Sequence, residues 1–477
     1  MKLFSSHGDM ARRLAADGRT DFTPTNANDE RVLHDLRRLG FVRQPAAGRS
    51  WCWNGTHPAD DRALLTLLAR FDLDLEVGPA PDELVWIALA IAPSPPGGTT
   101  RDVFSGSGFS PADAIRACLG EFAETQSWLY RPNHPVKRCD RTVLGAAALD
   151  PWHLLGFAGG QRKQRLALNR DWLGYDSIPE PAAFDGEIDW SRVEALSGAP
   201  ARWLPSQMCF GRYAERASGT GSPWRSDSNG CAAGRTSRGA LSRALLELIE
   251  RDATGIWWYG AVPRPAVAPS VIGGDVLADA MARRAQMGQQ AWLLDLTHDL
   301  EMPVVAAILI DREGSLLALG FGCDAELLGA ARSAYREMCQ MELSVALTRH
   351  RAAQADGAAR PEDQRLLDWM AAATPDRLPH LRPADDLQPC TASEGARRAE
   401  DIVERVLGRL QRAGLEAFSI DLQQDDIGIP AVRAFVPGLC HFKPRLGHRR
   451  LVEVPRALGW RNTGFTAADL TALPLLL

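Results

Sequence analysis

A turn of small residues followed by a long helix rich in alanine and leucine is the feature that most constrains this chain. The segment reads SNGCAAGRTSRGALSRALLELIERD and runs from Ser228 to Asp252. Residues three positions apart lie on one face of a helix, so Glu247 and Glu250 are expected to form a patch of two carboxylates. Their neighbours are apolar, which predicts partial burial, and buried carboxylates need cations.

A second segment, SPADAIRACLGEFAETQSWLY, has the same character. Ser110 is a suitable N-cap, Pro111 fits the first helical position, and Glu121 and Glu124 again lie one turn apart. Four glutamates from two helices could surround Mg²⁺ and a nucleotide, because magnesium binds carboxylate oxygens and keeps waters for phosphates. The alternative is that each pair lies on a solvated helix face with arginine or lysine partners.

The turn SNGCAAG before the longer helix offers two glycines and small side chains. Such a turn can present backbone N–H groups to an anion at a helix N-terminus. No G-x-x-x-x-G-K-[ST] motif occurs in the chain, so the turn is not a Walker loop.

Periodic apolar residues and short apolar runs predict a chain of the α/β or α+β class. We predict two parts: an N-terminal region, 1–80, expected to dock a partner or a leader peptide, and a main domain, 81–477. Helices are expected at 29–41, 60–71, 330–350 and 395–414, and strands at 83–92, 303–310, 316–323, 417–422 and 429–438.

Charge and cysteine content exclude several classes of protein. The formal net charge of −5 gives no basic field, so no nucleic-acid partner is expected. The nine cysteines occur singly without a C-x-x-C pair, which favours reduced thiols in the cytoplasm. Neither an apolar signal segment nor a run of about 18 apolar residues occurs, so no membrane association is expected. Cys440 and His441 are adjacent in an expected strand and would point to opposite faces, which argues against a nucleophile pair.

SNGCAAGRT and ALLELIERDATGIWWY together closely resemble the signature of the YcaO family, in particular its thiazole/oxazole-forming peptide maturase branch. SGSGFSPADAIRACLGEFAE resembles the family's first nucleotide-binding helix. The resemblance covers roughly residues 85–477 and implies a YcaO-type fold of mixed β-sheets packed with helices, preceded by a small helical or αβ N-terminal region. Further similar segments are 149–161, 189–206, 292–309, 426–442 and 449–460.

Members of this branch use ATP and Mg²⁺ to activate a backbone amide of a ribosomal peptide. A Cys, Ser or Thr side chain attacks the preceding carbonyl, the oxygen is phosphorylated, and loss of phosphate leaves an azoline ring. The resemblance therefore implies an ATP-dependent cyclodehydratase of bacteriocin-type maturation. The implied partners are the precursor peptide, a ubiquitin-activating-enzyme-like protein that binds the leader, and a flavin-dependent dehydrogenase that makes the azole. A second copy of this chain is a further candidate partner.

The resemblance also suggests site residues. The nucleotide-binding set is Glu121, Ser228, Asn229, Arg235, Glu247 and Arg251, and the metal-binding set is Glu124, Glu250 and Glu337. Azoline-forming members often end in a proline-rich tail, and here the end reads DLTALPLLL. One interpretation makes the terminal carboxylate of Leu477 catalytic, and the other is an apolar tail that packs into the core.

The chain departs from the family pattern at six positions of the nucleotide site. The departures are Ser107 for the lysine of a Gly-Lys-Gly turn, Ala117 and Thr125 for Ser and Arg of the first helix, Arg235 and Gly239 for Asn and Glu after the small-residue turn, and Ser333 for the arginine of R-x-x-x-E. Because each charge-assisted contact contributes roughly 1.5–3 kcal/mol, these losses should weaken ATP binding.

Two hypotheses stay open after these departures. The chain is either an active cyclodehydratase or a non-catalytic subunit that binds the peptide or a partner in the same complex. Arg235 either grips a phosphate or pairs with the glutamates in place of magnesium. A contact between Arg235 and Glu247 or Glu250 would count against ATP binding. Arg332 is a candidate substitute for the arginine missing at Ser333.

Overall fold

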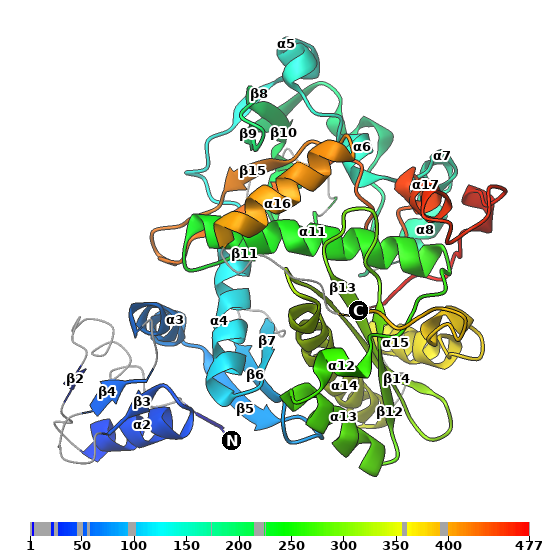
Figure 1. The fold of residues 1–477 in the computed structure, drawn as a ribbon. Helices are drawn as coiled ribbons and strands as arrows, with labels where there is room; N and C mark the ends of the chain where they lie inside the picture. The colour runs from blue at the N-terminus through cyan, green and yellow to red at the C-terminus, as the bar shows by residue number, and fades with distance from the viewer. Residues whose placement is uncertain are drawn as a thin grey trace.

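The computed structural model describes residues 2–3, 21–22, 27–44, 51–54, 58–93, 102–172, 174–213, 224, 226–354, 360–391 and 399–476. Within these residues the strands form four sheets, and every pairing between named strands is antiparallel. The fold is therefore α+β, and the α/β alternative with parallel strands does not hold. Figure 1 shows how the helices cover these sheets.

The strands group by sheet. The first sheet has the order β1 (Lys2–Leu3), β5 (Asp74–Pro79), β6 (Trp86–Ile91) and β7 (Val103–Gly108). The second has the order β10 (Arg202–Pro205), β9 (Glu187–Ala195), β15 (Phe418–Asp421), β16 (Ala431–Phe435) and β11 (Cys231–Ala233), with β8 (Lys137–Asp140) also on β9. The third is β12 (Gln290–Asp295), β13 (Val304–Ile310) and β14 (Leu316–Cys323), and the smallest is β2 (Asp21–Phe22), β4 (Trp51–Trp53) and β3 (Val42–Arg43).

Three long helices organise the molecule: α4 (Pro111–Trp128), α11 (Ser237–Tyr259) and α14 (Leu327–Gln354). Helix α4 packs on the first sheet, α11 on β16, and α14 on the third sheet. Figure 1 shows α4 and α14 approaching α11 from the same side. The other helices are α2 (Ala27–Arg38), α3 (Pro58–Arg70), α5 (Arg141–Leu144), α6 (Pro151–Leu155), α7 (Gly159–Lys163), α8 (Arg165–Asp171), α9 (Ser206–Cys209), α12 (Pro269–Ile272), α13 (Val276–Gln286), α15 (Pro361–Ala372), α16 (Ala399–Arg412) and α17 (Arg450–Ala457).

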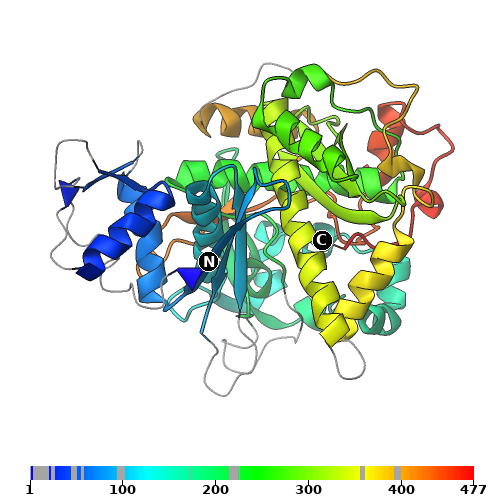
Figure 2. The same cartoon turned by 90° about the horizontal axis from the view of Figure 1, so that it is seen from below.

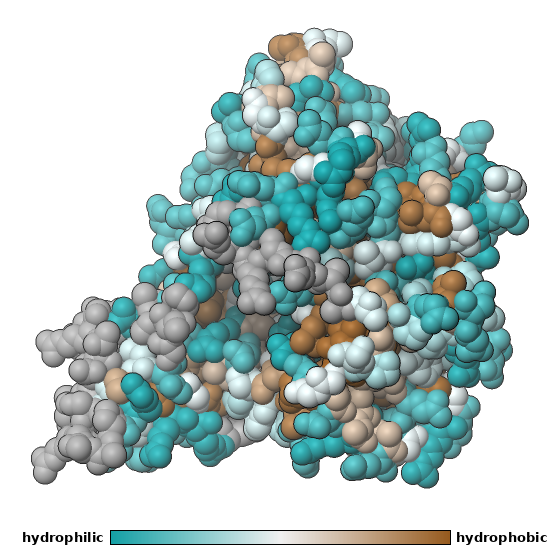
Figure 3. Space-filling view, in the orientation of Figure 1, coloured by the Kyte–Doolittle hydropathy of each residue, from teal (hydrophilic) through white to brown (hydrophobic). Residues whose placement is uncertain are grey.

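The expected helices and strands are present in the described residues, with ends that differ by a few residues. Helix α4 begins as predicted, because Ser110 Oγ accepts a hydrogen bond from the Asp113 N–H and Pro111 follows it. Helix α16 ends before Gly414, whose φ of 71° lies in the left-handed region. Its outer face is hydrophilic in Figure 3, while Val403, Val406 and Leu410 are buried beneath it.

The segment Gly106–Gly108, aligned with a Gly-Lys-Gly turn, is instead the end of strand β7. A Cβ on Gly106 would lie 2.1 Å from the Cys118 backbone nitrogen, and one on Gly108 would lie 2.5 Å from Asp113 Cβ. Both glycines are therefore needed for the close approach of β7 to α4, and the turn interpretation is wrong.

The N-terminal elements α2, α3 and the small sheet lie to one side of the main body in Figures 1 and 2. Their buried residues, among them Leu33 and Trp51, belong to the same apolar core as Phe122 of α4. Strand β5, inside the region predicted as 1–80, pairs along its whole length with β6. The N-terminal region therefore contributes a strand to the first sheet, and its docking role stays a prediction.

A buried ion-pair network fixes α11 against the C-terminal part of the chain. Arg450 donates to Asp252 Oδ2 over 2.6 Å and to Asp299 Oδ1 over 2.7 Å. The same Asp252 accepts from the Cys440 N–H at 2.7 Å, and His298 Nε2 lies 3.0 Å away. Burial raises the pKa of Asp252, but Arg450 and His298 outweigh that effect and hold it far below its usual range.

The C-terminal tail packs against α11 up to Leu476. Trp258 donates to the Leu473 carbonyl, Trp369 donates to the Pro474 carbonyl, and Leu475 is fully buried. The tail thus docks into the core, as one of the two interpretations held. Leu477 lies outside the described residues, so its catalytic role stays a prediction. No helix in the described part of the chain is long and apolar enough to cross a membrane.

We predict that Asp252→Ala lowers the free energy of unfolding by about 3–5 kcal/mol, because it leaves Arg450 buried beside Asp299 alone. Urea unfolding followed by tryptophan fluorescence measures the change. The matched control is Glu453→Ala on α17, the helix that carries Arg450. It removes only an exposed partner of Arg449 and should leave the urea midpoint unchanged. Equal midpoints for Asp252→Ala and wild type would contradict the anchoring role.

Candidate functional site

Five glutamates from three helices gather around one arginine. Glu121 and Glu124 come from α4, Glu247 and Glu250 from α11, and Glu337 from α14. Arg251 lies 3.8 Å from Glu247 and 3.6 Å from Glu250, and the charges of Glu121 and Glu337 act on it as well. The two glutamate pairs predicted from helical spacing are therefore brought together, and Glu337 joins them.

These carboxyl groups are short of positive charge. Burial, with repulsion from Glu121 and Glu337 and partly offset by Arg251, raises the pKa of Glu247 to about 7. Burial and the charge of Glu337 raise the pKa of Glu250 to about 8, and burial with Glu121 and Glu247 raises that of Glu124 well above its usual value. A cation placed among them would stabilise their ionised forms and so offset both the cost of burial and the repulsion between them.

The cluster is open to solvent on the side of α4. Glu121 and Ala117, one turn apart on α4, are both exposed, whereas Glu250 is buried. Ala117 stands where the family pattern has serine, so a short side chain leaves space beside Glu121. Thr125, the other departure on this helix, is half-buried and its carbonyl accepts the capping N–H of Leu129.

The small-residue turn lies directly before β11 and faces the cluster. Ser228 is exposed and Asn229 is half-buried, with its Oδ1 atom buried and without a hydrogen-bond partner among the described residues. Gly230 has a φ of 79°, and a Cβ there would lie 2.4 Å from the Ala434 carbonyl oxygen. Glycine is therefore required at this position of the turn.

Arg235 does not pair with Glu247 or Glu250. Its Nε atom lies 2.6 Å from Asp60 Oδ2 on helix α3, so the salt bridge that would replace magnesium does not form. Gly239, in the first turn of α11, donates its N–H to the N-cap Thr236. We therefore leave Arg235 out of the proposed site and keep its phosphate contact only as an untested prediction.

Arg332 is not the substitute for the arginine missing at Ser333. It pairs through Nε and Nη2 with Asp275, the N-cap of α13, away from the carboxylates. Two other arginines that sequence reasoning missed do face the cluster. Arg243 lies one turn before Glu247 on α11, a spacing of four residues that was an available signal, and Arg336 directly precedes Glu337 on α14.

The carboxylates fit a magnesium–nucleotide complex better than a metal held by protein alone. Within the described ranges, no three His, Cys, Asp or Glu side chains are arranged to hold a metal ion. Magnesium is commonly bound through one or two carboxylates, with phosphates and waters completing its shell. Five acidic groups with raised pKa values around Arg251 match that donor chemistry.

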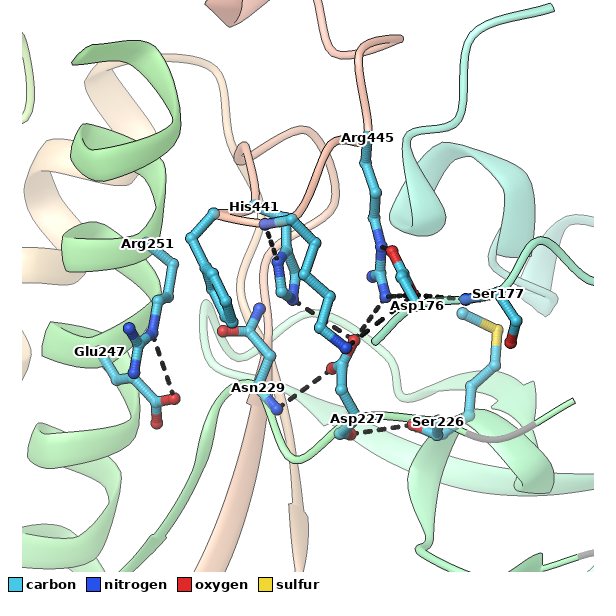
Figure 4. Close-up of polar contacts among 12 residues, drawn as sticks. Asp176, Ser177, Ser226, Asp227, Asn229, Glu247, Arg251, His441 and Arg445 are labelled. Atoms are coloured by element: carbon cyan, nitrogen blue, oxygen red, sulfur yellow. Dashed lines mark hydrogen bonds and ion pairs between the residues drawn. The ribbon is translucent and has the colours of Figure 1, made fainter. Parts of the chain in front are cut away.

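A cavity adjoins the cluster on the far side of Asn229. Figure 4 shows Arg251 and Glu247 on one side of Asn229, and Asp227, His441 and Arg445 on the other. Arg445 donates to Asp227 Oδ2 over 2.5 Å and to Asp176 over 3.2 Å. The opposite wall is apolar and includes Leu154, Leu155, Met208, Trp224 and Leu439.

His441 contributes a neutral donor to this cavity. Its Nδ1 atom accepts from the Lys443 N–H at 2.9 Å, which leaves the proton on Nε2, 3.3 Å from Asp227 Oδ2. Burial, with the charge of Arg445, lowers the pKa of His441 to about 4, so the ring stays uncharged at neutral pH. No Cys–His pair is seen in the described residues, since the two ring nitrogens of His441 face the Lys443 N–H and Asp227. Nothing in the sequence pointed to this cavity, because its walls come from distant segments.

Comparison with known proteins decides the family. Residues 105–440 match the family model described as YcaO cyclodehydratase, ATP- and Mg²⁺-binding. The chain belongs to the YcaO family. The matched residues contain all five glutamates and Arg251, so the cluster lies inside the part of the chain that defines the family.

Two solved heterocyclases are similar to this YcaO chain. A heterocyclase in complex with substrate and cofactor has 26% sequence identity and a TM-score of 0.77, over 94% of this chain. The heterocyclase TruD has 29% identity and a TM-score of 0.65, over 77% of this chain. The chain spans 60% and 52% of the length of those two chains. These similarities support the cyclodehydratase branch seen in the sequence.

One solved structure of lower identity agrees on the fold, and one further relative is similar in sequence. A YcaO from Methanopyrus kandleri bound with AMPPCP and Mg²⁺ has a TM-score of 0.53 at 19% identity, over 80% of this chain and 91% of that chain. An uncharacterized protein of Methanothermobacter thermautotrophicus is 30% identical over 295 residues, which are 58% of this chain and 74% of that protein.

We predict that the thermal stability of the metal-free protein falls as pH rises from about 5 to 8. A carboxyl group whose pKa is raised on folding favours the folded state less as it ionises, and the pKa values near 7 and 8 at Glu247 and Glu250 set this window. Mg²⁺ bound together with ATP engages ionised carboxylates, so with ATP present throughout, Mg²⁺ should raise the unfolding temperature more at pH 8 than at pH 6.

Differential scanning fluorimetry across pH, with and without Mg²⁺, measures this dependence. Glu250→Gln should flatten the slope and reduce the Mg²⁺ response, whereas Glu362→Gln, an exposed acid on α15, should change neither. A Mg²⁺ response of equal size at both pH values would show that these carboxyl groups do not bind the metal.

Proposed function

We propose that this YcaO chain is an ATP- and Mg²⁺-dependent cyclodehydratase that forms azoline rings from Cys, Ser or Thr of a ribosomally made peptide. The observation that carries the proposal is the convergence of five glutamates and Arg251 from α4, α11 and α14 in a solvent-accessible cluster. The similarity to two heterocyclases supports the reaction type.

The proposed roles fall on two adjoining sites, the glutamate cluster and the cavity beyond Asn229. Glutamates of the cluster would hold Mg²⁺, and Arg251, whose Nε atom makes no hydrogen bond within the described residues, would orient a phosphate. ATP supplies the phosphoryl group that makes the amide oxygen a leaving group. Asn229 would mark the boundary between nucleotide and peptide, because its unpartnered Oδ1 can accept the N–H of a backbone amide.

We place the reacting peptide residue in the cavity beyond Asn229. Its apolar wall excludes water around Met208 and Trp224, and its polar wall offers the His441 Nε2–H as a donor and Asp227 as an acceptor. Burial raises the pKa of Asp227, but Arg445 and His441 together hold it well below its usual range, so this carboxylate stays ionised and can orient a thiol or hydroxyl.

The alternative of a non-catalytic scaffold is less favoured. A salt bridge from Arg235 to the glutamates would have favoured it by replacing Mg²⁺, and Arg235 instead pairs with Asp60. The precursor peptide, a leader-binding protein and a dehydrogenase remain the proposed partners, with the N-terminal region as the proposed docking part. All nine cysteines are free, which agrees with the proposed location in a reducing cytoplasm.

We predict that wild type binds Mg²⁺–ATP and that Glu247→Ala weakens this binding at least about tenfold, since a charge-assisted group is lost. Isothermal titration calorimetry on the full chain measures it. Glu404→Ala is the matched control, because exposed Glu404 on α16 pairs with Arg238, and this variant should bind as wild type does.

Absence of Mg²⁺–ATP binding by a folded wild-type protein would overturn the ATP-dependent reaction and return the scaffold alternative. Where a cognate precursor peptide is co-expressed with the chain and its partner, mass spectrometry should show loss of one water for each ring formed. Glu250→Gln should abolish that loss.

A further inference from the structure

Arg336 is a half-buried guanidinium without an ion-pair partner among the described residues. The arginines buried in the core differ in this respect, because Arg284, Arg445 and Arg450 each pair with an aspartate. Burying a cation without an ion-pair partner is costly, so a bound anion would stabilise Arg336 at this position. Arg336 lies on α14 beside Glu337, at the edge of the glutamate cluster.

The guanidinium of Arg336 bridges two elements with hydrogen bonds to neutral acceptors only. Nη1 donates to the Ser107 carbonyl at 3.2 Å, Nη2 to Ser333 Oγ at 3.4 Å, and Nε to the Arg332 carbonyl at 3.3 Å. Arginine has five N–H donors, so two remain without a partner in the described part of the chain. Its place is thus fixed while two donors and a full charge stay available.

The positions that Arg336 touches are two of those where the family pattern has lost a cation. Ser107 aligns with a lysine and Ser333 with an arginine, and one guanidinium contacts both residues. The third neutral contact, to Arg332, keeps the side chain from swinging towards solvent. A single cation therefore occupies the space between two missing ones.

Arg243 faces Arg336 from the other side of the cluster. Its Nη1 atom donates to the Ala233 carbonyl at 3.2 Å, no carboxylate in the described ranges pairs with it, and its charge repels that of Arg336. The charges of Arg336 and Arg243 repel each other, and those of Glu337 and Glu124 offset them only in part, without an ion pair in the described residues. The phosphates of a nucleotide would supply further negative charge, while Mg²⁺ would engage the carboxylates nearby.

We infer that Arg336, opposed by Arg243, binds phosphate oxygens of the nucleotide and takes over from the cations absent at Ser107 and Ser333. The inference rests on the proposed function, since it assigns further residues to the same nucleotide site. Guanidinium suits this task, because it remains charged and offers paired donors to phosphate oxygens.

Calorimetric titration of the full chain with Mg²⁺–ATP tests the inference. Arg336→Gln should weaken binding roughly 10- to 100-fold, as expected for a hydrogen-bonded charge. Its unfolding temperature without nucleotide should not fall, because an unpaired cation has been removed. Two controls are matched: Arg332→Gln removes a neighbouring cation that pairs with Asp275, and Gln340→Leu removes an uncharged contact to Ser107. Both should bind Mg²⁺–ATP within about twofold of wild type.

A charge-relocation variant separates a phosphate contact from a structural one. Ser333→Arg combined with Arg336→Gln should recover most of the lost affinity, because it returns a cation to the same space. Binding by Arg336→Gln equal to wild type, or a loss matched by Gln340→Leu, would overturn the inference. If wild type binds and Glu247→Ala does not, the proposed function stands whatever Arg336→Gln shows. If wild type fails to bind Mg²⁺–ATP, the proposed function itself fails.

Discussion

Helix α11 depends on the buried contact between Asp252 and Arg450, which fixes the rotation of the helix about its own axis. Successive helical residues are turned by roughly 100°, so Asp252 points away from the face that carries Glu247, Glu250 and Arg251. The same aspartate also binds the Cys440 N–H and thereby ties α11 to the segment that bears His441. The charged residues at the end of this helix therefore have two separate roles. One face presents carboxylates to a ligand, and the other anchors the helix through Asp252.

The site contains carboxylates and guanidiniums whose charges are only partly neutralised within the protein. Burial, together with repulsion between neighbouring carboxylates, raises the pKa values of Glu124, Glu247 and Glu250, while Arg336 and Arg243 make no ion pair within the described residues. The two groups are neighbours, yet they do not pair with each other at ion-pair distance in the described residues. A metal ion bound to a polyanion satisfies both groups at once: the metal engages carboxylates, and the anion engages guanidiniums. Salt bridges between these carboxylates and guanidiniums would have neutralised both groups, and a bound metal and anion would then stabilise the site less.

Local features of this chain could be predicted from its sequence, and contacts between distant segments could not. Helical spacing was enough to pair Glu121 with Glu124 and Glu247 with Glu250, because three-residue spacing is a property of one helix. The start of α4 at Ser110 was readable for the same reason. The convergence of α4, α11 and α14 came from family resemblance and not from periodicity.

The incorrect predictions from the sequence have one physical cause, which is contact between segments that lie far apart along the chain. Arg235 was placed by its position after the turn, but its direction is set by Asp60 on α3, a helix that was expected at 60–71 but whose nearness to Arg235 the sequence could not give. Gly106 and Gly108 were taken for a turn, and the close approach of α4 makes them part of a strand. The cavity joins Asp176, Asp227 and Arg445, which are far apart in the chain. Comparison by position also counts Ser107 and Ser333 as two lost cations, whereas the structure has one guanidinium at both. No such replacement is present on the described α4, where Thr125 stands for an arginine, and the site is most open on that side because Ala117 and Glu121 are exposed.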